Sequence, residues 1–111
     1  MKIATHKKVT LEKFGVEAAD IHEWIDGLFD HKSFNEFCRT GVLAGFNPYE
    51  HRKYRHCKEA VEEAIEIFKD RYTEDIIRKV FESHVREDYF GYYPSIDDFG
   101  KEKFLKKYHI Y

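Results

Sequence analysis

Residues 73–88 decide the fold class of this chain, and their sequence is TEDIIRKVFESHVRED. Thr73 is of a residue type that caps helix N-termini, so we expect a helix to begin directly after it. The apolar side chains that follow recur at steps of three and four residues, as one face of a helix requires. They are Ile76, Ile77, Val80, Phe81 and Val85. The pattern predicts an amphipathic helix that ends near Asp88.

Two polar residues of this predicted helix lie on its apolar face. At about 100° per residue, His84 and Asp88 fall within about 20° to 30° of the centre of the apolar stripe, which is near Ile77. A buried carboxylate is costly without a partner, so we expect Asp88 to meet a cation, a metal ion or hydrogen-bond donors. His84, one turn earlier on the same face, is the nearest candidate.

A second helix is predicted over about residues 48–68. Asn47 can accept a hydrogen bond from a free amide at the helix start, and Pro48 suits the first helical position because it has no amide hydrogen. Apolar positions again recur at three- and four-residue steps, namely Tyr54, Cys57, Val61, Ala64, Ile65 and Phe68. We expect this helix to pack antiparallel to residues 73–88 and to form the centre of the fold.

Shorter helices are expected nearer the N-terminus. Residues 16–29 show an amphipathic pattern, and Gly15 is expected to end an earlier helix. Phe34 and Phe37 indicate a short helix or turn, and residues 41–46, with two glycines, indicate a connecting loop.

The C-terminal part of the chain predicts a loop and one short helix. Residues 89–94 combine a glycine and a proline with four aromatic rings, so this loop is expected to lie on the core. Ser95 and Asp98 resemble a capping box that opens a short helix through Leu105. Together these patterns predict an all-α, single-domain bundle of four or five helices over residues 1–111.

The composition excludes several classes of protein. A chain of 111 residues with 42% hydrophobic residues fits one domain, and a formal charge of −2 argues against a surface built for nucleic acid. No stretch approaches the roughly 20 apolar residues of a membrane span, and residues 1–14 hold no apolar run typical of a signal peptide. We therefore expect a soluble cytoplasmic protein in which Cys38 and Cys57 are free thiols. Phosphate-binding loops, nucleophile elbows and zinc-ribbon cysteine pairs are not present in the sequence.

The spacing of His84 and Asp88 recurs earlier in the chain. His22 and Asp26 also stand four residues apart, so both lie on one side of their predicted helix, beside Trp24. Two such pairs suggest that imidazole and carboxylate groups from different helices meet.

A basic segment, residues 50–58, stands at the start of a predicted helix. Basic residues at a helix start are mildly unfavourable, because the helix dipole favours acidic residues there. Inward-pointing carboxylates such as Asp26 and Asp88 would compensate for this. His51 and His56 lie about 140° apart on a helical wheel, so one straight helix presents at most one of them to a shared ion.

These residues are compatible with two interpretations. The first is a metal site, because first-row transition ions such as Zn, Fe or Mn bind mixed imidazole and carboxylate ligands. The second is a buried polar network in which neutral histidines hydrogen-bond to the carboxylates, and Arg52 and Arg55 pair with them. The spacing leaves both open, since no short motif such as HExxH is present. The candidate metal ligands are His22, either His51 or His56, His84 and Asp88.

Several short motifs follow one another along the chain. They are His6 ahead of Lys13-Phe14-Gly15, His-x-Trp-x-Asp at residues 22–26, His-Arg-x-x-x-His at residues 51–56, Glu-x-His-x-x-Glu-Asp at residues 82–88, and Pro94-Ser95. In this order they resemble a family of small, histidine-rich bacterial and phage-associated domains of unknown function. The chain departs from that family in having Cys57 where a second histidine is frequent, and in a longer segment over residues 28–48.

The resemblance implies a helical domain but no reaction. It implies that seven polar residues gather in one place: His6, His22, Asp26, His51, His56, His84 and Asp88.

The leading hypothesis from the sequence is a metal-binding protein, in its specific form a small metal-dependent hydrolase. Asp26 would orient a ligand histidine or act as a general base, and Arg52 and Arg55 would receive an anionic group of a small substrate. The alternative is a phage or host regulatory module that binds a protein, or less readily nucleic acid. In that case the histidine, aspartate and arginine cluster only holds the helices together.

Overall fold

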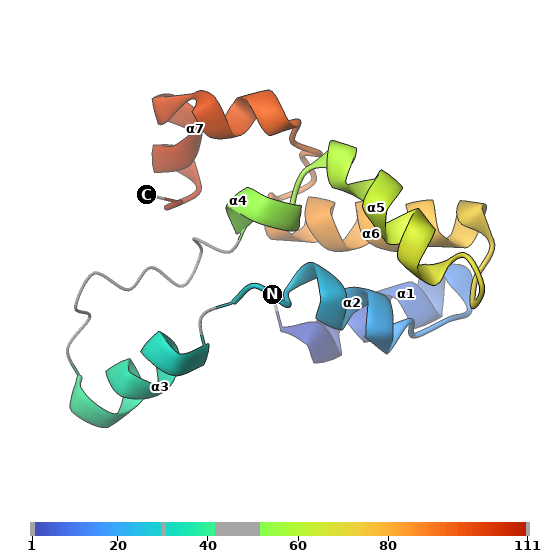
Figure 1. The fold of residues 1–111 in the computed structure, drawn as a ribbon, viewed down its shortest axis with the longest axis horizontal. Coiled ribbons are helices and arrows are strands. Elements are labelled where there is room, and N and C mark those ends of the chain that lie inside the picture. The colour runs from blue at the N-terminus through green and yellow to red at the C-terminus, as the bar shows by residue number, and fades with distance from the viewer. Residues whose placement is uncertain (1, 30, 42–51, 111) are drawn as a thin grey trace.

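The computed structural model describes residues 2–29, 31–41 and 52–110, which form helices and no strands (Figure 1). The all-α fold class is therefore confirmed for these residues. Six of their helices are longer than one turn, against the four or five expected. The α-helices are α1 (Ile3–Phe14), α2 (Ala19–Ile25), α3 (His31–Thr40), α4 (Arg52–Arg55, a single turn), α5 (Val61–Phe68), α6 (Glu74–Asp88) and α7 (Glu102–Lys107). Two 3₁₀ segments are η1 (Lys58–Ala60) and η2 (Ile96–Gly100).

Helix α6 is the central element, and it has the bounds that the sequence predicts. The Thr73 side chain accepts a hydrogen bond from the amide of Ile76 at 3.3 Å, which caps the helix start. Helices α1, α2 and α5 all pack against α6, and α5 runs antiparallel to it (Figure 1). The apolar face of α6 is thereby buried in the core, and the polar residues on that face are buried with it.

The predicted continuous helix at residues 48–68 is wrong in its middle part. Helix α4 ends at Arg55, and Cys57 has an extended backbone with φ −141° and ψ 154°. The amide of Lys58 donates at 2.8 Å to the carbonyl of Pro94 instead of to a helical partner. A tertiary hydrogen bond thus replaces a local one, and the chain turns at His56 before η1 and α5 continue. Residues 48–51 lie outside the described residues.

The N-terminal helices follow the prediction with different bounds. Gly15 ends α1 in the left-handed conformation, with φ 79°, and its amide donates to the carbonyl of Leu11. Helix α2 is shorter than the predicted helix at residues 16–29, because Ala18 adopts a positive φ of 51° just before it and Asp26 ends it. Helix α3 lies away from the other helices (Figure 1). The predicted loop at residues 41–46 falls almost wholly outside the described residues.

The C-terminal segment closes one end of the core. Tyr89 is fully buried and lies 5.8 Å from Phe104 and 5.0 Å from Tyr108 between ring centroids. Phe90 is 93% exposed and Tyr92 is 45% exposed, so the expectation that the loop at residues 89–94 lies on the core holds only in part. The positive φ of 55° at Phe90, directly after the end of α6, turns its side chain outward.

The capping box at Ser95 forms, but the helix it opens is interrupted. The carboxylate of Asp98 accepts a hydrogen bond from the amide of Ser95 at 2.9 Å. The segment η2 then stops at Gly100, and α7 begins at Glu102. The predicted helix through Leu105 is therefore two short pieces, because the glycine favours a break.

Two further expectations concern the membrane and the cysteines. None of the helices in the described part of the chain has the length and apolar character to cross a bilayer. Cys38 is exposed and Cys57 is buried, and both are free thiols.

Candidate metal centre

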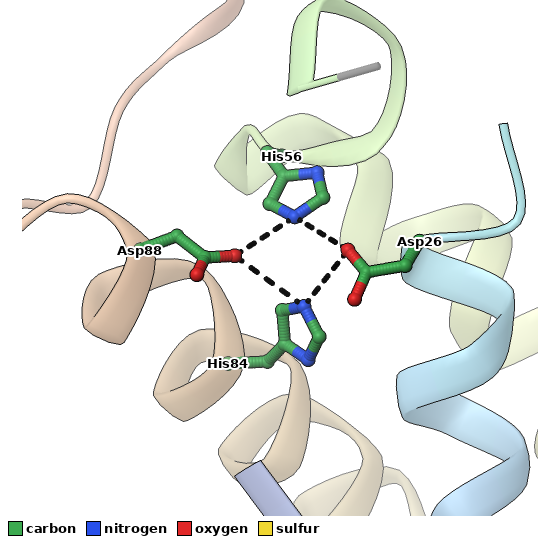
Figure 2. A group of neighbouring side chains, drawn as sticks. All are labelled: Asp26, His56, His84 and Asp88. Carbon is green, nitrogen blue, oxygen red and sulfur yellow. Dashed lines mark hydrogen bonds and ion pairs between the residues drawn. The ribbon is translucent and has the colours of Figure 1, made fainter. Parts of the chain in front are cut away.

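Four side chains from three parts of the fold point at one another (Figure 2). Asp26 stands at the C-terminal end of α2, and His56 stands at the turn directly after α4. His84 and Asp88 lie one turn apart on the buried face of α6. Each offers one ligand atom, and these atoms all lie within 4.8 Å of one another. We call this group the His/Asp cluster.

The ligand atoms form a closed ring in which imidazoles and carboxylates alternate (Figure 2). The Nε2 atom of His56 lies 3.1 Å from Oδ1 of Asp26 and 3.0 Å from Oδ2 of Asp88. The Nε2 atom of His84 lies 3.3 Å from Oδ1 of Asp26 and 3.5 Å from Oδ2 of Asp88.

These spacings match the edges of a metal coordination shell. Nitrogen and carboxylate ligands lie about 2.0–2.2 Å from a zinc ion. Two ligands at that distance are about 3 Å apart at an angle of 90° and about 3.4 Å apart at the tetrahedral angle. The four edges of the His/Asp cluster run from 3.0 to 3.5 Å, and all four ligand atoms lie within 4.8 Å of one another, so the cluster is of a size to hold one ion.

The cluster is closed on most sides and accessible on one. The side chains of His56 and His84 are fully buried, and that of Asp88 is 2% exposed. The side chain of Asp26 is 18% exposed. Solvent therefore approaches the cluster past Asp26.

The protonation equilibria of the cluster favour ionised carboxylate and neutral His84. Burial lowers the pKa of His84 to about 4. Burial opposes ionisation of Asp88, but its contacts with His56 and His6 outweigh burial and hold the pKa of this carboxyl far below its usual range. Burial also opposes a charge on His56, but hydrogen bonds to Asp26 and Asp88 raise its pKa above the ordinary value. Without a metal ion, His56 is thus the cationic partner of the two carboxylates.

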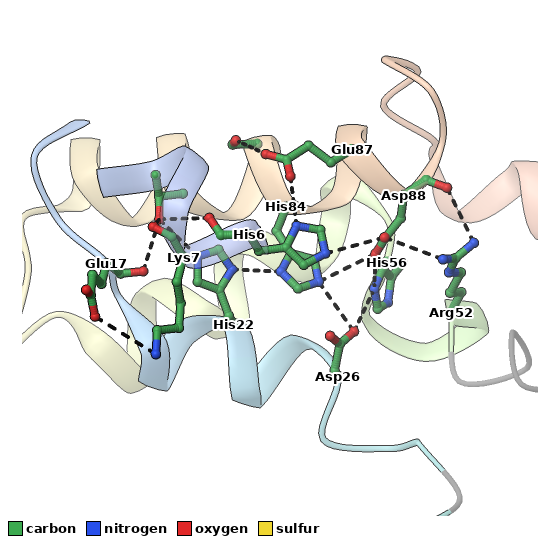
Figure 3. A network of polar contacts seen from close by, with 12 residues as sticks. His6, Lys7, Glu17, His22, Asp26, Arg52, His56, His84, Glu87 and Asp88 are labelled. Carbon is green, nitrogen blue, oxygen red and sulfur yellow. Dashed lines mark hydrogen bonds and ion pairs between the residues drawn. The ribbon is translucent and has the colours of Figure 1, made fainter. Parts of the chain in front are cut away.

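A further imidazole, His6 of α1, holds the other side of Asp88 (Figure 3). Its Nε2 atom lies 3.4 Å from Oδ1 of Asp88, and its Nδ1 atom lies 2.9 Å from Oε2 of Glu87. The other oxygen of Glu87 accepts a hydrogen bond from Ser83 at 2.8 Å. The ring of His6 also stacks on that of His84, with centroids 3.7 Å apart. Helix α1 therefore fixes both α6 members of the His/Asp cluster.

His22, a predicted ligand, lies one imidazole away from the cluster. Its Nδ1 atom is 2.8 Å from Nδ1 of His84, and its Nε2 atom is 3.1 Å from the hydroxyl of Thr10 (Figure 3). The structure thus places His22 behind His84, and Asp26 takes the place in the ring.

The two arginines predicted to meet a substrate have different surroundings. Arg52 is buried, with Nη2 3.4 Å from Oδ1 of Asp88 and Nη1 donating to the Asp88 carbonyl at 3.4 Å. Arg55 donates from Nη1 to the carbonyl of Trp24 at 2.6 Å, and its guanidinium lies 4.3 Å from the centre of the Trp24 ring. A Cβ atom on Gly27 would lie 3.0 Å from Nη1 of Arg55, so this guanidinium lies close to the backbone of the residue that follows Asp26.

The remaining histidines of the sequence lie outside the cluster or outside the described residues. His51 lies outside the described residues. His31 of α3 and His109 are exposed and are not part of the cluster. Neither residue spacing nor hydrophobic periodicity predicted that His6 would contact the cluster, and only the motif resemblance pointed to it.

Comparison of the chain with family models, with curated proteins and with solved structures finds no match. The resemblance to a histidine-rich family of unknown function therefore stays a prediction. The geometry of the His/Asp cluster is what points to a function.

Proposed function

We propose that this protein is a metal-dependent hydrolase that binds one divalent transition ion, Zn, Fe or Mn, through Asp26, His56, His84 and Asp88. The observation that carries the proposal is the ring of four ligand atoms with edges of 3.0 to 3.5 Å. Mixed imidazole and carboxylate donors are the set that such ions bind in proteins.

The charge of the cluster suits a divalent cation. Two ionised carboxylates and two neutral imidazoles carry −2, which a divalent ion neutralises in a buried place. His56 has to lose its proton when the ion binds, so metal binding competes with protons at this residue. Arg52 and His6 hold the Asp88 carboxylate from outside the ring and fix its orientation toward the ion.

The accessible side of the cluster is where hydrolysis would occur. An ion held by these four residues would need a fifth position for water, and it would lower the pKa of that water to about 7, so that hydroxide could serve as the nucleophile. Water and substrate reach the ion past Asp26, the most exposed member of the ring. The Arg55 guanidinium, which lies close to Gly27 directly after Asp26, would bind an anionic group of the substrate, so the proposed substrates are small anionic esters.

The test is metal analysis and hydrolysis with tag-free protein. We expect one equivalent of Zn, Fe or Mn in the wild type, and metal-dependent hydrolysis of p-nitrophenyl phosphate or bis(p-nitrophenyl) phosphate. Both properties should be lost in His84→Ala and kept in His31→Ala, a matched histidine variant outside the cluster. Metal binding without hydrolysis of either ester would refute the hydrolase and leave a metal-binding protein.

One observation favours a second candidate, a binding module whose cluster is purely structural. The raised pKa of His56 means that an imidazolium between Asp26 and Asp88 can satisfy both carboxylates without any ion. In that case the wild type would contain substoichiometric Zn, Fe and Mn, and its melting temperature would not change on chelation.

A further inference from the structure

A chain of three polar side chains leads from the His/Asp cluster to the junction of α1 and α2 (Figure 3). Thr10 Oγ1 lies 3.1 Å from Nε2 of His22, and Nδ1 of His22 lies 2.8 Å from Nδ1 of His84. All three residues are fully buried. We call Thr10, His22 and His84 the buried relay.

The first link of the relay has a fixed direction. The Thr10 hydroxyl lies 3.0 Å from the carbonyl oxygen of Glu17 and 3.2 Å from those of His6 and Lys7. A hydroxyl has one hydrogen, and carbonyl oxygens only accept, so the Thr10 hydrogen is directed to this group of carbonyls. Toward His22 the hydroxyl therefore presents a lone pair, and His22 donates.

The nitrogen of His22 that faces Thr10 is Nε2, because Nδ1 faces His84. The proton that His22 donates to the Thr10 hydroxyl is therefore on Nε2. In the opposite direction Thr10 would donate to His22, and the carbonyl of Glu17 would lose its hydrogen bond from the Thr10 hydroxyl.

Donor and acceptor can be assigned in the same way for the hydrogen bond between His22 and His84. The two Nδ1 atoms at 2.8 Å share one hydrogen, since two N–H groups at that distance would collide. The His22 side chain is fully buried between the Thr10 hydroxyl and the His84 imidazole, which favours the neutral ring, and its single proton is the one that Nε2 donates to Thr10. Its Nδ1 atom then accepts, and Nδ1 of His84 carries the hydrogen between them. The Nε2 atom of His84 is left as a bare lone pair.

We propose that Thr10 and His22 are positioning residues that fix the tautomer of His84, so that its Nε2 lone pair faces the metal position. The inference rests on the proposed metal function and explains how one ligand is prepared for it.

The geometry around Nε2 of His84 agrees with this role. The Nε2 atom of His84 lies within hydrogen-bond distance of Oδ1 of Asp26, at 3.3 Å, and 3.5 Å from Oδ2 of Asp88. With the tautomer that the relay sets, a lone pair faces these two oxygens, and that arrangement is repulsive unless a cation lies between them. A purely structural network would need a hydrogen on this nitrogen. The relay supplies the opposite tautomer, as a metal-ligating histidine requires.

The first test is the ring-nitrogen chemical shifts of ¹⁵N-labelled wild type, recorded without metal and with one equivalent of Zn²⁺. We expect His84 to carry its proton on Nδ1 and His22 to carry its proton on Nε2 in both samples, with Zn²⁺ shifting only Nε2 of His84 among these nitrogens. A proton on Nε2 of His84 in the metal-free protein would overturn the proposal. The metal-free spectrum decides the relay even if no Zn²⁺ binds, in which case the proposed function fails separately.

The second test is Zn²⁺ affinity, measured by competition with a chromophoric chelator. Thr10→Val keeps the shape of the side chain and removes the hydroxyl, and Thr10→Ser keeps the hydroxyl as the matched control. Loss of a partner behind a metal ligand typically weakens binding by about 10- to 100-fold, which we expect for Thr10→Val, with Thr10→Ser close to wild type. Equal affinity in all three proteins would overturn the role of Thr10. If Thr10→Val does not fold, the wild-type spectra still decide the proposal.

Discussion

The substitution Asp88→Asn tests the electrostatics of the His/Asp cluster in the metal-free protein. It keeps the size of the side chain and removes the charge that faces His56, His6 and Arg52. Removing one partner of a buried ion pair typically costs about 3–5 kcal/mol, because the other charge stays buried. For a domain of this length 1 kcal/mol corresponds to about 4 °C in Tm, so a fall of about 12–20 °C is expected.

The assay is thermal unfolding by circular dichroism at pH 7 in the presence of a chelator, with Asp97→Asn as the control. Asp97 is an exposed aspartate in η2, and its variant should melt within about 2 °C of wild type, as surface substitutions usually do. An Asp88→Asn protein that melts at or above the wild-type temperature would refute the reasoning. It would mean that repulsion from Asp26 outweighs the attraction of His56 and Arg52.

Three further predictions concern pH, packing and capping. Because burial lowers the pKa of His22 to about 3 and of His84 to about 4, against 6.5 in the unfolded chain, the unfolded state takes up protons first as pH falls. The stability that these neutral rings provide is therefore present above pH 6.5. Urea titrations of metal-free protein should show that the free energy of unfolding falls between about pH 6.5 and 4. A free energy of unfolding that does not change over this range would count against burial of the neutral rings. Gly27→Ala should destabilise the fold by about 1–3 kcal/mol, because the new Cβ atom would displace the Arg55 guanidinium from beside the Trp24 ring. The fluorescence of this single tryptophan should change as well, and an unchanged emission spectrum would contradict the prediction. Thr73→Ala should cost about 1 kcal/mol in urea unfolding through loss of the α6 cap, whereas Thr73→Ser should restore most of it.

The α6 half of the cluster could be predicted from the sequence. A helix of four turns has a well-defined apolar stripe, so the inward direction of His84 and Asp88 followed from their position relative to Ile77. The costly burial of Asp88 then required partners, and the structure provides them. Local periodicity was sufficient here because the helix is long and regular.

The partners from other segments could not be predicted in the same way. His22 and Asp26 share one helix side, but α2 ends at Asp26, so this side chain reaches the cluster while His22 meets Thr10 of α1. The position of His56 depends on the chain break at Cys57, where a hydrogen bond from Lys58 to the distant Pro94 replaces a helical one. Such tertiary contacts override helix propensity and leave no trace in residue spacing.

We propose that Asp26, His56, His84 and Asp88 hold a metal ion. The most direct measurement is anomalous scattering from a crystal of tag-free protein, with data collected above the Zn, Fe and Mn absorption edges. We expect one strong peak about 2.0–2.2 Å from Nε2 of His56, Nε2 of His84 and a carboxylate oxygen of each aspartate. No peak within the ring, or a peak bound only by residues outside it, would contradict the claim.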